Sequence, residues 1–237
     1  MPEFYYRETS NWEMQSFGQD IMNLCVVVPF LLITVFIKKE YGLFLWSGGI
    51  LYTLYTFLIY CFDIHFNVLF LDYCAILGLN FYLFLYFMYR QNSNPTYVYN
   101  TSRVSKITGF YFLIIAILFY CLWLSEIIPA IQSDSVPKSV ADAGVFTNPV
   151  HVIDIAIMLP GVFMVGVFLL REKKIGSLFA PIILSFLLLM SITIIVLSFL
   201  LSQGEKNNNL PVIFIMSVFA LLNILLLVLN FSKKGNV

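Results

Sequence analysis

Charged residues are scarce in this chain of 237 residues. Only 11% of them are Asp, Glu, Lys or Arg, whereas 60% are hydrophobic, and the mean hydropathy is +0.90. A soluble domain carries about 25% charged residues to cover its surface, so the composition argues against a soluble protein and favours one whose surface meets hydrocarbon. The formal net charge is zero, which gives no basis for a nucleic-acid partner.

Histidine and cysteine are also few, with two and four residues. Two histidines exclude a zinc site with three His ligands. The cysteines all lie inside apolar runs without metal-ligand spacing, so we expect them to be buried packing residues outside any disulfide framework. They are Cys25, Cys61, Cys74 and Cys121. Phosphate-binding loops, dinucleotide loops, haem-attachment motifs and a nucleophile elbow are absent too.

Seven long apolar runs dominate what is present. They are continuously apolar, whereas the strands of a membrane barrel alternate over about ten residues, so they predict helices. The polar, mildly acidic first 19 residues lack a basic n-region, so we expect no cleaved signal peptide. The fold class is therefore all-α, one seven-helix transmembrane domain over residues 1–237. The predicted spans are 18–37, 43–62, 68–89, 107–127, 150–170, 176–201 and 210–231.

Lys and Arg alternate between the connections of these spans. One side would hold ten of them and the other only Arg7, Lys138 and Lys206. The positive-inside rule then places the N-terminus outside and the C-terminus in the cytoplasm of a plasma or inner membrane. An odd number of spans is required, and seven satisfies it. The ten are Lys38, Lys39, Arg90, Arg103, Lys106, Arg171, Lys173, Lys174, Lys233 and Lys234.

An internal repeat is a further interpretation of the pattern. The first and fifth spans each contain a proline, Pro29 and Pro160, and each ends in a charged turn with a glycine. The arrangement would be three spans, a linker span and three spans in parallel, although chance similarity of apolar helices explains it as well. Aligning the prolines pairs Asp20 with His151 and Asn23 with Asp154.

Ionisable side chains gather near the predicted outer ends of several spans. His151 and Asp154 share one helix face because they are three residues apart. Asn148 suits the N-cap of that helix, and Pro149 suits its first position. Burying such groups in a bilayer costs about 2.5–3.5 kcal/mol each, so they usually face a bundle interior or water. The predicted outward pocket comprises Glu126, His151, Asp154, Asp72, Asn148 and Asp20.

Each of these residues also has a structural interpretation. Asp20, near the start of the first span, and Asp63 and His65, in the tight turn between the second and third spans, lie close enough to the membrane interface to be simply hydrated. Asp154 could accept hydrogen bonds from a neighbouring Tyr or Asn, or pair with His151. Two chemical roles stay open for Glu126, His151 and Asp154. They could ligate a divalent metal as the cofactor, or act as an acid–base set.

The motif Trp-Leu-Ser-Glu-Ile-Ile-Pro at 123–129, followed by Asn-Pro-Val-His-Val-Ile-Asp at 148–154, resembles a signature of small multi-spanning bacterial membrane proteins. The resemblance covers most of the chain and implies no activity, since none is assigned to that group. It singles out Glu126, Asn148, His151 and Asp154. In layout alone, the plan is similar to the SWEET sugar transporters. Alkaline ceramidases are also seven-span proteins, but they need His ligands near the last span. No His follows His151 in this chain, which argues against an enzyme of that type.

The sequence therefore favours an integral membrane protein that binds a cation or small polar solute in an outward pocket, for transport or sensing. A membrane-embedded, metal-assisted enzyme is one alternative, and a structural or accessory protein is another. The lipid bilayer is the expected partner, and the oligomeric state is open.

Overall fold

The computed structural model describes residues 3–37, 39–93, 102–204 and 209–232. Lys38, Lys206, Lys233 and Lys234 lie outside the described residues. Within the described part, the chain is helical without strands, and seven helices are long and apolar enough to cross a membrane, which confirms the predicted fold class. These spans are Ser10–Phe36, Glu40–Asp63, Phe70–Ser93, Ser102–Gln132, Pro149–Leu170, Lys174–Ser202 and Leu210–Ser232.

Two of the spans are built from several elements. The first comprises α1 (Ser10–Met22), the π-helix η2 (Asn23–Val27) and α2 (Val28–Phe36). The fifth comprises α7 (Pro149–Ile153), the π-helix η3 (Asp154–Met158) and α8 (Leu159–Leu170). The remaining helices are α3 (Lys39–Asp63), α4 (Phe70–Ser93), α5 (Ser102–Gln132), the short α6 (Lys138–Ala143), α9 (Lys174–Gly204) and α10 (Leu210–Ser232), and a short 3-10 turn, η1 (Glu3–Tyr5), precedes α1.

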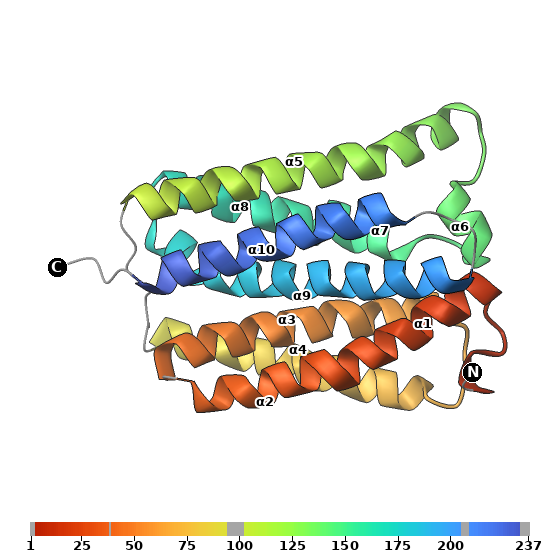
Figure 1. The fold of residues 1–237 in the computed structure, drawn as a ribbon, viewed down its shortest axis with the longest axis horizontal. Helices are drawn as coiled ribbons and strands as arrows, with labels where there is room; N and C mark the ends of the chain where they lie inside the picture. Colours follow the sequence, from red (N-terminus) through yellow and green to blue (C-terminus); the bar gives the residue numbers. More distant parts are fainter. Residues whose placement is uncertain (1–2, 38, 94–101, 205–208, 233–237) are drawn as a thin grey trace.

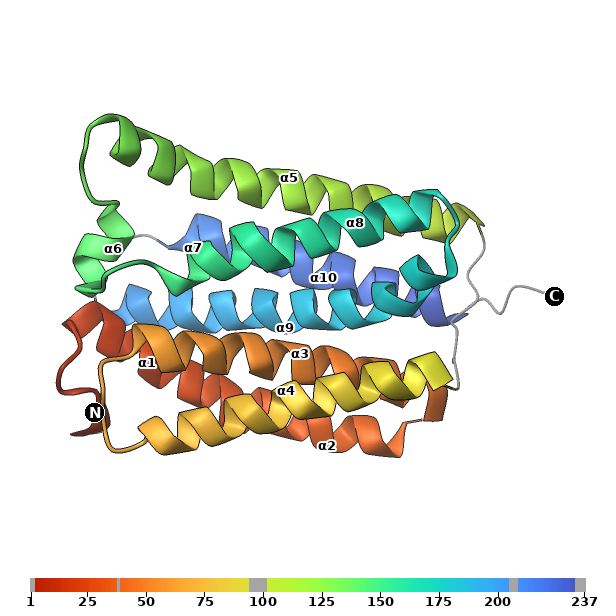
Figure 2. The ribbon, with the colours of Figure 1, turned by 180° about the vertical axis from the view of Figure 1, so that it is seen from behind.

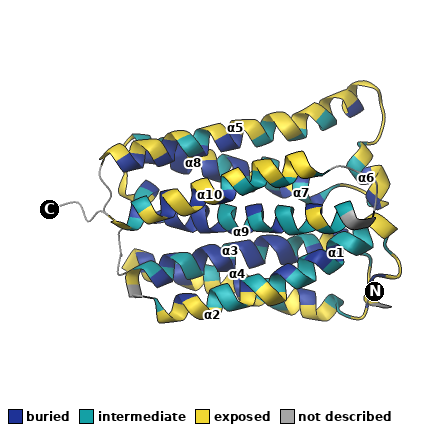
Figure 3. Ribbon diagram, viewed as in Figure 1, coloured by how far each residue is buried: buried dark blue, intermediate teal, exposed yellow. Residues whose placement is uncertain are grey.

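Helices α3 and α9 form the centre of the bundle (Figures 1 and 2). In the most apolar window of α3, 61% of the residues are buried, against 17% in α4 and in α10. Figure 3 shows the same contrast, with buried residues along α3 and exposed ones along α5 and α10. The peripheral helices therefore present apolar side chains to the predicted bilayer, as a membrane protein requires.

Glycine allows the two central helices to approach closely. A β-carbon at Gly48 of α3 would lie 2.4 Å from the β-carbon of Ser185 and 2.6 Å from the carbonyl oxygen of Ile182, both on α9. Gly109 on α5 and Gly166 on α8 meet in the same way. Small residues at such crossings are the usual way for membrane helices to pack, as the Ser47-Gly48-Gly49 sequence indicates.

The cysteines correct one expectation. Cys25, Cys74 and Cys121 are exposed and Cys61 is only partly buried, so the prediction that they are buried packing residues is wrong. Continuous apolarity does not show which face of a membrane helix points inward, because the bilayer accepts apolar side chains on the outer face as readily as the core does.

The two ends of the bundle differ in charge. At one end, here called the basic end, lie Arg90, Arg171 and the first turn of α5 with Arg103 and Lys106. The opposite end carries α6 and the starts of α1, α7 and α10, and we call it the α6 end (Figure 1). The first described residues and the last turn of α10 lie at opposite ends (Figure 1), as an odd number of spans requires.

The segment before α1 folds over the α6 end. Tyr5 is 1% exposed and donates a hydrogen bond of 2.7 Å to Asp20 Oδ2. Burial is the main cause that raises the pKa of the Tyr5 hydroxyl, so it keeps its proton and remains a donor. Glu8 accepts from the backbone N–H of His65 at 2.7 Å, and its Oε2 lies 3.0 Å from His65 Nδ1. The N-terminal segment is therefore fixed to α1 and to the connection between α3 and α4.

The two π-helices occupy matching positions in the first and fifth spans. Each ends two residues before a proline, Pro29 or Pro160, which is the second residue of the α-helix that follows. A proline ring clashes with the carbonyl four residues earlier in a regular helix, and a π-helical turn alters the backbone at that point. This match supports the predicted repeat of these two spans, while the superposition of three spans on three stays a prediction.

Candidate functional site

A cavity of about 490 Å³ lies in the α6-end half of the bundle. Residues of α1, α3, α5, α6, α7, α9 and α10 line it, together with Asp154 at the start of η3; no lining residue comes from the described part of α4. Six of the seven spans thus converge on one space, and Ser139 of α6 lines it as well.

Buried polar atoms without a hydrogen-bond partner concentrate at this cavity. Five side chains in the described part of the chain carry such atoms, and four of the five line the cavity. An unpartnered buried group costs about 1–3 kcal/mol, and native structures contain few of them. Their presence around one space indicates a place for water or a bound molecule. The four are Trp12 (Nε1), Asp63 (both carboxylate oxygens), Ser139 (Oγ) and His151 (Nε2).

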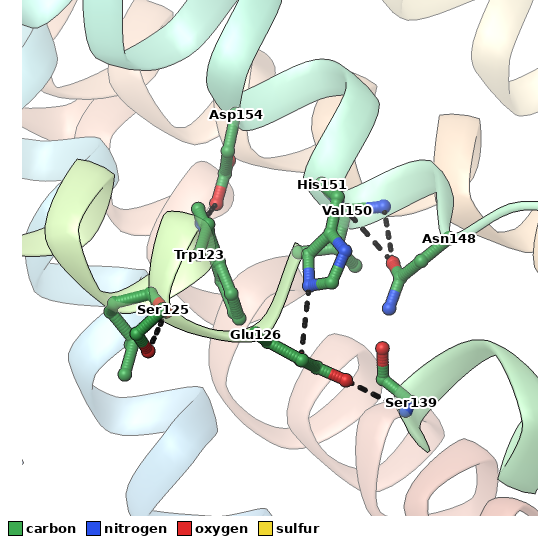
Figure 4. A network of polar contacts seen from close by, with 9 residues as sticks. Trp123, Ser125, Glu126, Ser139, Asn148, Val150, His151 and Asp154 are labelled. Carbon is green, nitrogen blue, oxygen red and sulfur yellow. Dashed lines mark hydrogen bonds and ion pairs between the residues drawn. The ribbon is translucent and has the colours of Figure 1, made fainter. Parts of the chain in front are cut away.

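Asp154 is held in the wall of the cavity by two donors. The indole N–H of Trp123 on α5 donates to Oδ2 at 2.9 Å, and the hydroxyl of Tyr55 on α3 donates to Oδ1 at 3.1 Å (Figure 4 shows the first contact). The carboxylate thereby joins three spans. The carbonyl of the next residue, Ile155, accepts from the Tyr120 hydroxyl at 2.9 Å. Asp154 is thus placed with its hydrogen-bonding capacity only partly used.

His151 lies one turn before Asp154 and is fixed from both sides. Asn148 caps α7, as predicted, by accepting from the backbone N–H groups of Val150 and His151 at 2.9 and 3.3 Å. The His151 ring lies 4.7 Å from the Trp123 ring, centroid to centroid. Its Nε2 is 3.6 Å from Glu126 Oε2, too far for a hydrogen bond. A small shift or an inserted water would connect the two groups.

Glu126 connects the short helix α6 to this site. Its Oε1 accepts from the backbone N–H of Ser139 in the first turn of α6 at 2.8 Å, while its Oε2 faces His151 (Figure 4). The free N–H groups at the start of a helix stabilise a carboxylate placed beside them, as the Glu126 carboxylate is placed beside the start of α6. Glu126 therefore connects α5, α6 and α7, although it is not among the residues that line the cavity.

The structure brings the three predicted residues together only in part. His151 and Asp154 line one cavity, whereas Glu126 faces His151 from outside the set of lining residues. Trp123 contacts both His151 and Asp154 (Figure 4). Among the described residues, no three His, Cys, Asp or Glu side chains are close enough to hold a metal ion. The geometry therefore gives the divalent-metal interpretation of Glu126, His151 and Asp154 no support.

Two of the predicted pocket residues lie apart from the cavity. Asp72 is exposed in the first turn of α4, where free N–H groups favour a carboxylate. Asp20 is not among the lining residues, and its two oxygens accept from the hydroxyls of Tyr5 and Tyr60 at 2.7 and 2.8 Å. Both side chains are accounted for without a ligand.

Asp63 departs from its sequence interpretation in the opposite direction. A residue in the tight turn between two spans was expected to be hydrated, but Asp63 is only 3% exposed and lines the cavity. The reason is the N-terminal segment, which covers this turn through the contact of Glu8 with His65. A long-range contact of this kind leaves no local pattern in the sequence.

Sequence reasoning also missed the contribution of the first helix. Helix α1 begins at Ser10, eight residues before the predicted start of the span. Its polar residues Trp12, Gln15, Ser16 and Gln19 line the cavity. Their low hydropathy hid the helix, yet polar residues are what a water-facing cavity wall requires.

A second, smaller cavity continues from the first toward the basic end. It measures about 70 Å³, and Asp154 lines both. Asn223 on α10 also lines it, is 1% exposed and has an amide nitrogen without a partner. Its oxygen accepts from the Tyr111 hydroxyl at 3.0 Å. Two turns further along α10, Asn230 donates to Thr108 at 3.1 Å. A row of polar pairs thus lies between α5 and α10, which the sequence interpretation had not identified.

No family model, no curated protein and no solved structure matches this chain.

Proposed function

We propose that this polytopic membrane protein binds a small polar solute in the 490 Å³ cavity, and that the cavity faces the outside of the cell. The observation that supports this most strongly is the set of four buried, unpartnered polar side chains around one space. A structural network satisfies its own donors and acceptors, whereas a binding site leaves some of them for the ligand. The outward orientation follows from the Lys and Arg distribution.

The dimensions and the wall of the cavity fit a small solute. Pockets that bind small molecules measure about 300–1,000 Å³ and combine an apolar wall with a few placed polar groups. Apolar side chains such as Ile59, Ile194 and Leu197 supply most of this wall, and carboxylate, imidazole, indole and hydroxyl groups supply the polar points.

Transport of the solute is favoured over sensing by the position of Asp154. Its side chain lines both the outer cavity and the smaller one beneath, and the polar pairs of α5 and α10 continue toward the basic end. A purely sensory pocket needs no such continuation. Transporters build their binding sites at helices whose regular geometry is interrupted, and Asp154 begins such an interruption, η3.

Binding can be tested with the purified full-length protein in lipid nanodiscs. A panel of neutral, cationic and anionic solutes is added at millimolar concentration, and thermal unfolding is followed. A solute at 100 times its Kd stabilises the folded state by about 2.7 kcal/mol. The cavity-filling variant Ile59→Trp should abolish the stabilisation, while Leu71→Trp, on the exposed face of α4, should preserve it.

Two outcomes would contradict the proposal. If no solute of the panel stabilises the protein, the cavity is a packing defect of an accessory protein. If a solute stabilises the protein equally well after Ile59→Trp, it binds elsewhere.

A further inference from the structure

The charge of the residues that line the cavity indicates which class of solute it binds. Two carboxylates line it, Asp63 and Asp154, and among the described lining residues there is neither Lys nor Arg to balance them. Asp154 has two hydrogen-bond donors, whereas both oxygens of Asp63 are buried without one. The imidazole near Asp63, that of His65, faces Glu8 at 3.0 Å and does not bond Asp63. A buried carboxylate without a hydrogen-bond donor is strongly unfavourable. Asp63 is therefore the group in the cavity that most needs a positively charged partner.

The kind of cation follows from the geometry of the donors. A bare metal ion would require several oxygen or nitrogen ligands around one point, and the described residues form no group of three acidic, His or Cys side chains that could hold a metal ion. An ammonium group needs no such shell, because its N–H groups donate to a carboxylate directly. A quaternary ammonium group has no N–H to offer and would leave the Asp63 oxygens unpartnered.

Aromatic side chains add to this preference. Tyr60 lies one turn before Asp63 on α3, and Trp12 on α1 lines the same cavity. Aromatic faces attract ammonium groups by about 0.5–2 kcal/mol. The unpartnered N–H of Trp12 and the Nε2 of His151 require hydrogen-bond partners in addition, which a hydroxyl or carbonyl oxygen on the same solute provides.

We propose that the cavity binds a primary amine that carries a hydroxyl or carbonyl oxygen, with Asp63 as its counter-ion. This inference rests on the proposed function and specifies its substrate class. The amine is either a free solute or the headgroup of a lipid in the outer leaflet. Two hollows flank the cavity: one of about 500 Å³ shares Asp63 with it, and one of about 460 Å³ shares His151. Exposed apolar side chains, Phe62 and Phe146 among them, line these hollows, so both sources have access.

Calorimetric titration in phosphatidylcholine nanodiscs tests the free-amine source. Ethanolamine supplies both groups, choline lacks the N–H donors, and ethylene glycol lacks the charge. We expect ethanolamine to bind, choline to bind at least 10-fold more weakly, and ethylene glycol to give no heat above dilution. The lipid source is tested without added amine. Nanodiscs containing phosphatidylethanolamine should then raise the Tm above the value in pure phosphatidylcholine.

The variant Asp63→Asn separates a counter-ion from a structural residue. It keeps the shape but removes the charge, so ethanolamine affinity, or the lipid effect, should fall at least 10-fold. The Tm without ligand should stay equal or rise, because an unpartnered buried charge has been removed. Asp72→Asn, the same change on the exposed face of α4, should leave both values unchanged.

The results that overturn the proposal are specific. If neither amine source acts while neutral or anionic solutes bind in the cavity, the amine inference is wrong and the proposed function stands. If no solute binds at all, both are wrong. Unchanged ethanolamine affinity in Asp63→Asn would remove Asp63 from the site, and a lowered Tm without ligand would make it a structural residue.

Discussion

At the residue scale, the site depends on side chains whose helical spacing is visible in the sequence and on partners whose identity is not. The spacing of His151 and Asp154 and the cap at Asn148 were predictable because they are local properties of one helix. The position of Trp123 between His151 and Asp154 was not, because it depends on how α5 is rotated against α7. Sequence periodicity fixes a helix face only when polar and apolar faces differ, and α5 is apolar almost all round.

Asp154 provides the first prediction at this scale. Asp154→Ala removes the acceptor of two buried donors, Trp123 and Tyr55, and should lower the free energy of unfolding by about 1–3 kcal/mol for each. Asp154→Asn retains one acceptor oxygen and the shape, so it should cost less and stay folded while solute binding is lost. SDS titration of the purified variants measures the first quantity and calorimetry the second. Equal destabilisation by both changes with binding retained would make Asp154 a structural residue.

Glu126 provides the second. Because it anchors the first turn of α6 through Ser139, Glu126→Ala should release α6 and raise the rate of proteolysis between residues 133 and 147 about 10-fold, which corresponds to one lost hydrogen bond of about 1.4 kcal/mol. Glu126→Gln keeps the acceptor and should change the rate little. Ser125→Ala is the control, since Ser125 bonds only within its own helix, to Leu122. Equal cleavage in all three variants would show that α6 is held by other contacts.

At the element scale, the crossing of α3 and α9 determines whether the cavity has its walls. Gly48→Val would place a β-carbon within 2.6 Å of α9 backbone and side-chain atoms, so the helices must separate and the protein should lose several degrees of Tm or fail to fold. Gly78 on α4 has nothing within 4 Å of the same position, and Gly78→Val should be tolerated. Thermal unfolding compares the two directly. An unaffected Tm in Gly48→Val would show that the crossing is looser than described.

The interrupted helices show where sequence reasoning ended at this scale. Pro29 and Pro160 are visible in the sequence, and the structure places a π-helix before each of them. The type of irregularity was not predictable, because a proline is accommodated by a kink, a π-turn or a neighbouring hydroxyl. The long first helix was missed for another reason. Polar residues before Asp20 carry no hydropathy signal, although they continue the helix and line the cavity.

At the scale of the whole molecule, seven apolar runs were enough to predict seven spans, since hydrocarbon leaves an isolated segment no alternative to a helix. The orientation rests on Lys and Arg alone. We expect Lys138→Cys to react with an impermeant thiol reagent on intact cells, and Lys173→Cys to react only after permeabilisation. The four native cysteines are exposed or partly buried, so their replacement by alanine should leave a folded background for labelling. The opposite labelling pattern would show that the protein has the reverse orientation and that the cavity faces the cytoplasm.

The central claim is that a water-accessible, acidic cavity reaches from the outside to Asp154. Ile194 lines both the large cavity and the adjoining small one. A cysteine at this position therefore reports whether water reaches the place where the two cavities meet. In the cysteine-free background, Ile194→Cys on intact cells should react with an impermeant cationic thiosulfonate, and more slowly with an anionic one. Leu225→Cys, on the exposed face of α10, should not react because lipid keeps its thiol un-ionised. If Ile194→Cys is unreactive on intact cells, or reacts only after permeabilisation, the outward cavity proposed here does not exist.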